Sequence, residues 1–323
     1  MVALSRRQLV LSATTAAATL GLDRRFTFLG ASPAWADSAM DAGFLRFKVG
    51  DIEMTALFDG AWVRDHDPGF IKNASVDETK AALAAAGLPT DKVTIPFSVM
   101  VARIGDRTVM FDSGTGGQLA PTAGLIMTKG MAAAGIDPAS IATIAVTHYH
   151  PDHIFGMMAK DTNAPVFPNA EIIVPAAEHE WWTDESVFTK LPEARHGLAK
   201  RIKATLGTWS NVRPVGDDVE ILPGVRTVAS HGHTPGHTSY HLSSGSEQLM
   251  VLGDVSNIPA LFLSHPGWHA SFDADPVMAE ETRRRMMDRV VADKLMVAGY
   301  HYPFPAAGNV ARDGEGYTFA PIA

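Results

Sequence analysis

The sequence predicts an α+β fold in a single domain, with two β-sheets packed face to face and helices on their outer sides. Two observations support this prediction. The chain contains two blocks of short strand-like runs, each accompanied by helical patterns, and no linker-like or low-complexity stretch separates the blocks. Of the 323 residues, 46% are hydrophobic, which is enough to build a sizeable core. We therefore expect one domain with an internal duplication of architecture.

Two hairpins are predicted in the first block. Residues 44–58 form two alternating apolar and polar runs on either side of Gly50-Asp51, which is typical of a hairpin with a tight turn. Residues 95–111 repeat this pattern around Gly105-Asp106. The second run leads directly into Asp112, so this hairpin is expected to end at an acidic side chain.

Helices and a short strand complete the first block. Ser75-Val76-Asp77-Glu78 has the spacing of a capping box and opens an Ala-rich helix that should end near Gly87. Another helix is predicted over 122–134, ending at Gly135. The β-branched run at 141–146 predicts a strand that ends just before a histidine-rich segment.

The second block repeats this order of strands and helices. Asp275-Pro276 supplies an N-cap and a first-turn proline for a helix to about Val291, and 295–298 should form a buried strand ahead of His301. Gly, Pro or Ser residues break the region before this helix into four predicted strands, at 219–222, 225–230, 238–242 and 248–252.

Composition excludes several classes of function. The formal net charge is -8 and no run of more than three Lys or Arg residues occurs after residue 25, so no nucleic-acid-binding surface is indicated. The chain contains no cysteine, which excludes disulfides and thiolate ligands. Any metal site must therefore use His, Asp and Glu.

The N-terminus predicts export. Ser5-Arg6-Arg7-Gln8-Leu9-Val10 precedes a weakly apolar run to about Leu22, and Ala34-Trp35-Ala36 follows, an order that resembles a bacterial twin-arginine signal with its cleavage site. The alternative is a frayed helix that happens to carry two arginines. We expect residues 1–36 to be a signal peptide and 37–323 to be the mature domain, in the periplasm or secreted. No other segment reaches the ~20 apolar residues of a membrane span, so no membrane association is expected of the mature form.

The segment T-H-Y-H-P-D-H at 147–153 carries the strongest chemical signal. It places His148, His150, Asp152 and His153 directly after a predicted strand, although the whole chain has only 13 histidines. Neutral imidazole is a common ligand of zinc-like ions, and a neighbouring carboxylate offsets the charge of a dication. Any one of these histidines alone would be interpreted as a surface residue of a polar loop, but the pattern as a whole indicates a metal site.

Three further candidate regions each follow a predicted strand. The segment A-S-H-G-H-T-P-G-H-T-S at 229–239 is a tight loop containing three histidines, Asp254 ends L-M-V-L-G-D, and His301 ends L-M-V-A-G-Y-H. A buried carboxylate or imidazole at the end of an apolar run is costly unless it is paired or bound to a metal. Their common position at strand ends indicates a shared site.

At these residues the sequence resembles the metallo-β-lactamase superfamily. The similarity lies in H-x-H-x-D-H at 148–153, the later H-T-P-G-H, an Asp after an apolar strand and a late His. The resemblance implies a four-layer αββα sandwich with a dinuclear metal centre at the sheet edges. It assigns His148, His150 and His233 to one metal, Asp152, His153 and His301 to the other, and Asp254 to both.

The resemblance also implies supporting residues around these ligands. Asp112 matches an acidic position that supports the site without binding metal. His237 is expected to lie beside the ligands, and His231 is expected to be structural or more distant. Zinc is the expected ion at both positions, although manganese, cobalt or iron would accept the same ligands.

Within the superfamily the chain is most similar to methyl parathion hydrolase-like enzymes. The similar stretches include G-D-I-E-M-T-A-L-F-D-G at 50–60 and G-E-G-Y-T-F-A-P at 314–321, besides the two histidine segments. The absence of cysteine and the shared Asp254 argue against the antibiotic-cleaving branches. Quorum-sensing lactonases have a Tyr three residues after the shared Asp, where this chain has Asn257, which argues against homoserine-lactone cleavage by the Tyr-dependent mechanism.

The expected function is hydrolysis of small neutral esters, lactones or organophosphate triesters by a hydroxide held between two metal ions. Asp254 and Asp152 are assigned to the catalytic step as well as to metal binding, and for Asp254 the ligand role is favoured over that of general base. Two alternatives are a hydrolytic dehalogenase on the same site and a catalytically inactive periplasmic metal-binding protein. The resemblance also suggests a homodimer.

Aromatic side chains after the first metal motif could form the wall of a substrate pocket. These residues are expected on loops, and only one of the adjacent Trp181 and Trp182 is expected to face such a cavity, because two neighbouring side chains cannot easily both point into it. The alternative for all of these residues is a place in the core. The pocket candidates are Phe155, Trp181, Trp182, Phe188 and Asn257.

Overall fold

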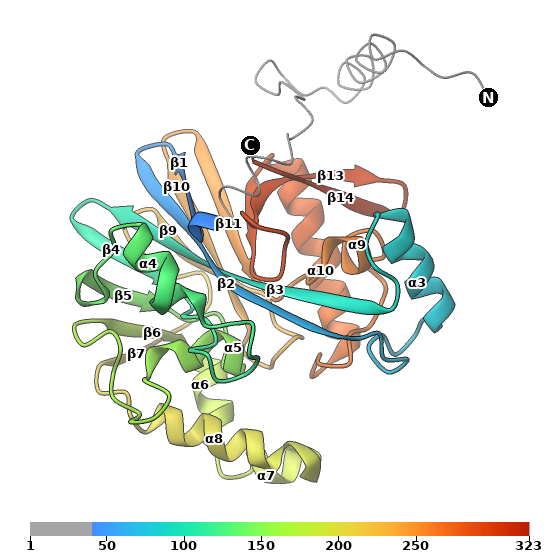
Figure 1. The fold of residues 1–323 in the computed structure, drawn as a ribbon. Coiled ribbons are helices and arrows are strands. Elements are labelled where there is room, and N and C mark those ends of the chain that lie inside the picture. Colours follow the sequence, from blue (N-terminus) through green and yellow to red (C-terminus); the bar gives the residue numbers. More distant parts are fainter. Residues whose placement is uncertain (1–40, 323) are drawn as a thin grey trace. The chain divides into compact units, whose positions relative to one another are not determined.

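The computed structural model of the protein describes residues 41–322. Two seven-stranded sheets make up its centre (Figure 1). The predicted signal peptide at 1–36 lies outside the described residues. Within the described range, no helix has the length and apolar character needed to cross a bilayer.

The first sheet contains its strands in sequence order, and antiparallel hairpins give way to parallel pairing from β4 onward. Its strands are β1 (Phe44–Val49), β2 (Ile52–Asp65), β3 (Lys92–Ile104), β4 (Arg107–Phe111), β5 (Ile141–Ala145), β6 (Glu171–Pro175) and β7 (Val212–Val215).

The second sheet has the order β14-β13-β12-β11-β10-β9-β8, with β11 and β12 parallel and the other pairs antiparallel. Its strands are β8 (Glu220–Leu222), β9 (Val225–Ala229), β10 (Thr238–Ser244), β11 (Glu247–Gly253), β12 (Met296–Gly299), β13 (Ala307–Asp313) and β14 (Gly316–Pro321).

Helices lie along the outer sides of both sheets, with α4 and α6 along the first sheet and α10 along the second (Figure 1). The α-helices of the described residues are α3 (Val76–Ala85), α4 (Met131–Ala133), α5 (Pro151–Ile154), α6 (Ala176–Thr183), α7 (Val187–Lys190), α8 (His196–Leu206), α9 (Pro259–Phe262) and α10 (Pro276–Ala292). The predicted α+β sandwich with helices outside two facing sheets is therefore confirmed.

The inner faces of the two sheets meet in an apolar core. The rings of Phe111 on β4 and Tyr240 on β10 lie 5.4 Å apart, and both side chains are fully buried. The Tyr240 hydroxyl donates a hydrogen bond to the carbonyl of Val146, 2.6 Å away, at the point where β5 ends. This bond joins the second sheet to the start of the histidine segment.

Local turn and cap signals in the sequence were reliable. Both predicted hairpins are present, with turns between β1 and β2 and between β3 and β4. The Ser75 hydroxyl caps α3 and the Glu78 carboxylate accepts from the Ser75 backbone N–H, as the capping box predicts. The Asp275 side chain accepts from Met278 N at the start of α10.

The helix predicted over 122–134 begins later than expected. A π-helical turn at Ile126–Gly130 continues into α4, whereas the preceding residues pair with β2. Ala61 N donates to the carbonyl of Thr122, and Gly124 N donates to the carbonyl of Asp59. These residues satisfy their backbone groups against the sheet, so they do not enter the helix.

Candidate metal centre

Four loops that follow strands bring the predicted ligands to one end of the two sheets. His148 and His150 follow β5, and His150 precedes α5, whose first turn carries Asp152 and His153. His233 lies between β9 and β10, Asp254 follows β11, and His301 follows β12. Because β4, β5 and β6 are parallel, as are β11 and β12, their carboxyl ends lie at the same edge of each sheet.

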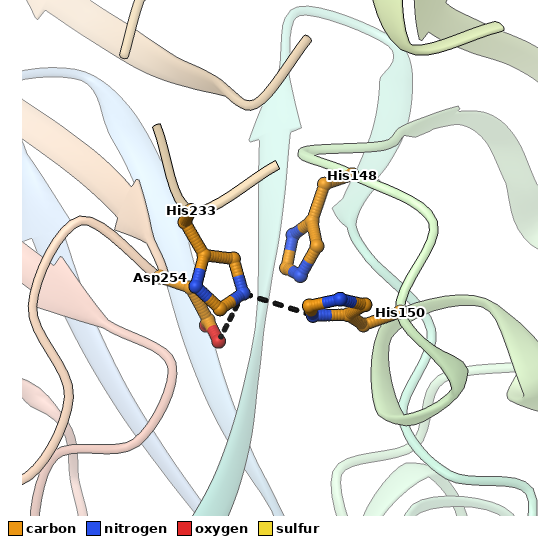
Figure 2. Close-up of side chains that lie close together, drawn as sticks. All are labelled: His148, His150, His233 and Asp254. Atoms are coloured by element: carbon orange, nitrogen blue, oxygen red, sulfur yellow. Dashed lines mark hydrogen bonds and ion pairs between the residues drawn. The ribbon is translucent and has the colours of Figure 1, made fainter. Parts of the chain in front are cut away.

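His148, His150, His233 and Asp254 form the first cluster, in which one donor atom of each residue lies within 4.8 Å of the others. Figure 2 shows the three imidazoles and the carboxylate pointing toward a common centre. His233 Nε2 lies 2.9 Å from His150 Nδ1 and 3.2 Å from Asp254 Oδ2. This cluster has the donor types of a zinc-like site.

Asp152, His153 and His301 form the second cluster, again with donor atoms within 4.8 Å. Asp152 Oδ2 lies 3.5 Å from His153 Nε2 and 3.4 Å from His301 Nε2. Asp254 Oδ1 lies 3.2 Å from His153 Nε2, and its Oδ2 lies 3.1 Å from His301 Nε2. The Asp254 carboxylate thus lies between the two clusters and faces both.

Several atoms of these clusters are buried without a hydrogen-bond partner. His148 Nε2 is inaccessible to solvent and makes no hydrogen bond within the described residues, and His153 Nε2 and Asp254 Oδ1 are buried facing each other at 3.2 Å without forming a hydrogen bond. Buried polar atoms are normally satisfied, and an unpartnered donor or acceptor costs about 1–3 kcal/mol. Two dications coordinated by these atoms would remove that cost, so the residues fit a dinuclear centre.

Burial keeps two imidazoles of the first cluster, His148 and His150, neutral. Burial, followed by the neighbouring imidazoles, holds the pKa of His148 well below its usual range. Burial, followed by His233, lowers the pKa of His150 to about 3. Neutral imidazoles present lone pairs, which is the form that binds a metal ion.

Carboxylates surround the histidines of the second cluster and raise their pKa values. Burial opposes the charged form of His153, but Asp254, Asp112 and Asp152 raise the pKa of this imidazole well above its usual range. His301 shows the same balance, in which Asp254 and Asp152 outweigh burial and raise its pKa. The attraction that holds a proton at this cluster would also hold a dication.

Asp112, the residue that the resemblance assigns to a supporting position, contacts His153 of the second cluster. Its Oδ2 lies 2.8 Å from His153 Nδ1, and its two oxygens also accept from the backbone N–H and the hydroxyl of Thr147. Asp112 has a φ of 60°, a left-handed conformation that aspartate tolerates better than most residues. This carboxylate therefore fixes both the His153 ring and the start of the histidine segment.

His237 lies beside the ligands and contacts the shared carboxylate residue through its backbone. Asp254 N donates to His237 Nε2 over 2.9 Å, and Ser230 holds the other ring nitrogen of His237. A Cβ at Gly253, which has a φ of 57°, would lie 2.6 Å from His237 Nε2, so only glycine fits there. His231 instead faces the carbonyl of Pro235 and lies away from both clusters, as expected.

Sequence reasoning missed Asp273 and Arg283. Asp273 Oδ1 lies 2.9 Å from His233 Nδ1, and its other oxygen lies 3.5 Å from Arg283 Nη2. Arg283 is 2% exposed and donates to the carbonyls of Val255, Pro266 and Trp268. A buried arginine on α10 therefore holds together the segment after Asp254, including the carboxylate that orients His233.

Glu178 is a second residue that the sequence did not single out. It is fully buried on α6 and accepts hydrogen bonds from both histidine-bearing loops. Its position four residues before Trp182 places it on the apolar face of the helix. That spacing was the one available signal.

The predicted pocket residues fall into two groups. Phe155 and Trp182 are both 4% exposed and belong to the hydrophobic core, where Trp182 Nε1 donates to Glu178. Trp181 and Phe188 are partly buried at the edge of this core. Trp181 is therefore the less buried of the two tryptophans.

Asn257 is 6% exposed, and its Oδ1 is buried without a partner among the described residues. It follows the shared Asp254 by three residues. Its amide is therefore the polar group that this chain offers where Tyr-dependent lactonases carry a phenol.

Comparisons with known proteins identify the family. Residues 92–299 match the metallo-beta-lactamase superfamily, and the chain belongs to this superfamily. It is similar to an N-acyl homoserine lactonase of Bacillus sp, with 27% identity over 164 residues, 50% of this chain and 56% of the relative. An N-acyl homoserine lactonase of Bacillus cereus is 26% identical over the same shares. The match thus spans little more than half the length of these curated relatives.

Solved structures of the same fold cover most of the chain. AidC, a dizinc quorum-quenching lactonase, has a TM-score of 0.82 at 24% identity, covering 87% of this chain and 98% of its own. The hydrolase AbOPH of the beta-lactamase superfamily has a TM-score of 0.80 at 26% identity, with the same coverage. These neighbours confirm the predicted metallo-β-lactamase fold.

Proposed function

We propose that the protein is a dinuclear metal-dependent hydrolase that cleaves small neutral lactones and esters. One observation supports this most directly: seven His and Asp side chains form two adjoining donor clusters, with the Asp254 carboxylate facing both. His148, His150 and His233 would hold one divalent ion, and Asp152, His153 and His301 the other. Zinc is the ion we favour, because a structural neighbour is a dizinc lactonase.

Two bound dications would supply a nucleophilic hydroxide near neutral pH and polarise the carbonyl or phosphoryl oxygen under attack. The residues of the chain orient this chemistry. Asp254 Oδ2 lies 3.2 Å from His233 Nε2 and 3.1 Å from His301 Nε2, so this carboxylate lies between the two clusters and would orient the nucleophile there. The Asp152 side chain is 17% exposed against 3% for Asp254. Of the two carboxylates, Asp152 is thus better placed to pass a proton to solvent.

Lactones are the favoured substrates because the curated relatives are N-acyl homoserine lactonases. Aryl esters and organophosphate triesters are included because of the resemblance to methyl parathion hydrolase-like enzymes. The residue at position 257 bears on how a lactone would be cleaved, because Asn257 stands where Tyr-dependent lactonases have a tyrosine. An amide cannot replace the phenol of the Tyr-dependent lactonases as a proton donor, so we propose that any lactone cleavage here protonates its leaving group by another residue.

A reconstitution experiment tests the proposal. Purified protein is stripped with a chelator, reloaded with Zn²⁺, Mn²⁺ or Co²⁺, and assayed against lactone, aryl-ester and phosphotriester panels. We expect chelation to abolish turnover and metal to restore it, with two ions bound per chain. Turnover that survives chelation would contradict the proposal. Halide release from a chlorinated aromatic, without ester or lactone cleavage, would support the dehalogenase alternative.

We also propose, on the sequence alone, that residues 1–36 direct twin-arginine export and that the mature chain begins near Asp37. Arg6→Lys with Arg7→Lys should retain the protein in the cytoplasm of a bacterial host, because this export route reads the arginine pair. N-terminal sequencing of the periplasmic protein would locate the cleavage site. Equal export of the double variant and the wild type would refute the signal.

A further inference from the structure

The Glu178 carboxylate is fully buried, and both of its oxygens are used twice. Oε1 accepts from Tyr149 N at 3.0 Å and from Trp182 Nε1 at 2.8 Å. Oε2 accepts from the Thr234 hydroxyl at 2.7 Å and from Gly236 N at 3.0 Å. Such a fully satisfied buried carboxylate is a rigid connection.

Three of these four donors come from the two loops that carry the histidines of the first cluster, and the fourth, Trp182 Nε1, comes from α6 itself. Tyr149 lies between His148 and His150, after a strand of the first sheet. Thr234 and Gly236 follow His233, between two strands of the second sheet. The Glu178 side chain on α6 therefore forms hydrogen bonds with both loops that carry histidines of the first cluster.

Four polar groups are directed at the Glu178 carboxylate. Burial raises the pKa of Glu178, against the opposing hydrogen bonds from Thr234, Tyr149, Trp182 and Gly236. Two backbone N–H groups and an indole N–H can only donate, whereas the Thr234 hydroxyl can also accept. Three of the four partners therefore require an acceptor oxygen of Glu178.

The loop that carries His233 packs so closely on α6 that no side chain fits between them at Gly236. A Cβ placed on Gly236 would lie 2.0 Å from Glu178 N, so the loop backbone packs directly on the helix. The position of the His150 ring depends on this packing through His233, which lies on the loop that packs on α6. Within the described residues, the His150 ring contacts no carboxylate or carbonyl and makes a single hydrogen-bond contact, to His233.

We infer that Glu178 is a positioning residue that fixes the separation of His150 and His233 and thereby sets the affinity of the first cluster for its metal ion. The inference rests on the dinuclear centre of the proposed function. It assigns no role to Glu178 in the second cluster, whose histidines are held by Asp112 and by the carbonyl of Pro96.

The decisive experiment compares Glu178→Gln with Glu180→Gln in the full chain. Glu180 is an exposed residue of the same helix, so Glu180→Gln controls for the general effect of replacing a glutamate by glutamine on α6. Affinities for Zn²⁺ are measured by competition with a chromophoric chelator, and the spectrum of bound Co²⁺ is recorded. A carboxamide places an N–H₂ group against at least one N–H that can only donate, Tyr149 N on one side or Gly236 N on the other, so a backbone hydrogen bond to one loop is lost.

We expect Glu178→Gln to weaken one of the two Zn²⁺ affinities by about 10–100-fold and to alter the Co²⁺ spectrum of that ion. The other affinity should stay within twofold of the wild-type value, and Glu180→Gln should match the wild type throughout. A folded Glu178→Gln protein that binds both ions with wild-type affinity would overturn the inference. Equal weakening of both ions would also overturn it.

Thr234→Val decides the case if Glu178→Gln does not fold. This change removes one of the four hydrogen bonds while keeping the side-chain shape, and Thr208→Val removes a hydroxyl that bonds only to the carbonyl of Thr205. The first variant should weaken one Zn²⁺ affinity and the second should not, and equal affinities would refute the inference. If the wild type binds two ions but hydrolyses no panel substrate, the proposed function fails while the affinity comparison still tests Glu178.

Discussion

The two donor clusters differ in where their negative charge lies. The first cluster uses three imidazoles, and burial lowers the pKa of two of them, His148 and His150; its supporting acids, Asp273 and Glu178, lie behind the ligands or behind their loops. The second cluster includes the carboxylate of Asp152 itself and has Asp112 in direct contact with His153. Asp254 alone belongs to both.

This difference shows two ways of preparing a site for a dication. In the second cluster, charged ligands attract the ion directly. The first cluster has the shared Asp254 and three histidines. Its affinity therefore depends more on the positions of the imidazoles, because imidazole lone pairs bind a metal ion well only when they already converge. We therefore expect the first cluster to depend more on residues that touch no ligand.

The largest effect is expected for Asp254→Ala, which removes the one ligand that both clusters share. Metal content should fall below two ions per chain, and kcat/KM for the best substrate should fall by more than about 100-fold, beyond the usual effect of a supporting residue. Atomic emission and steady-state kinetics measure the two quantities. Asp313→Asn, at an exposed position on β13, serves as the control. Retention of both ions with unchanged turnover would show that Asp254 is not a ligand shared by two metal ions, and a wild type that binds two ions without any turnover would favour a binding protein without catalytic activity.

Replacing the supporting acids should separate the two clusters. Asp273→Asn weakens the hold on His233 and Asp112→Asn the hold on His153, so each should lower the affinity for a different ion by about 10–100-fold. Chelator competition on each variant measures both affinities. If the two variants lost the same ion, the division into two clusters would be wrong.

Graded chelation of the wild type should empty the two clusters in sequence. The second cluster has one more carboxylate, and a unit charge near a protein surface interacts with another by about 4 kcal/mol at contact distance. We expect the two affinities to differ by at least about tenfold, with the weaker ion lost first. His301→Ala, which disables the second cluster, should leave only the weaker affinity. Simultaneous loss of both ions at one chelator concentration would show that the charge difference has no effect.

The smallest effect is expected for Tyr300→Phe. The Tyr300 hydroxyl donates to the carbonyl of Asp152, while its ring stacks on His153 with centroids 3.8 Å apart. Phenylalanine keeps the stacking and loses one hydrogen bond, which costs about 1 kcal/mol of unfolding free energy. Urea unfolding measures this loss, and metal content should remain at two ions. Loss of an ion in this variant would mean that the second cluster also depends on remote positioning.

Sequence reasoning located the seven clustered side chains because each follows a strand whose pattern is local. The alternation before Gly50 and Gly105 and the cap at Ser75 also depend on neighbouring residues, so these elements were predictable. The helix expected from residue 122 began late because the N–H of Gly124 bonds to a carbonyl of β2, a partner distant in sequence. Partners of that kind leave no periodic signal.

The supporting residues show the same limit more sharply. Glu178 and Glu180 are identical in type and two positions apart, yet one is fully buried and the other exposed. Asp273 lies two residues before the N-cap Asp275 in F-D-A-D-P, and its partner His233 comes from another loop. Single acidic residues acquire these roles only when the two sheets come together.

The segment 176–206 has a consequence for engineering and for divergence within the fold. It holds α6, α7 and α8, lies between two adjacent strands of the first sheet and contributes none of the seven clustered donors. Its residues could be exchanged to alter substrate preference without replacing any donor. Glu178 restricts that freedom, because a graft that omits the first turn of α6 would also cut the tie between the two histidine loops. Segment swaps should therefore begin after Trp182.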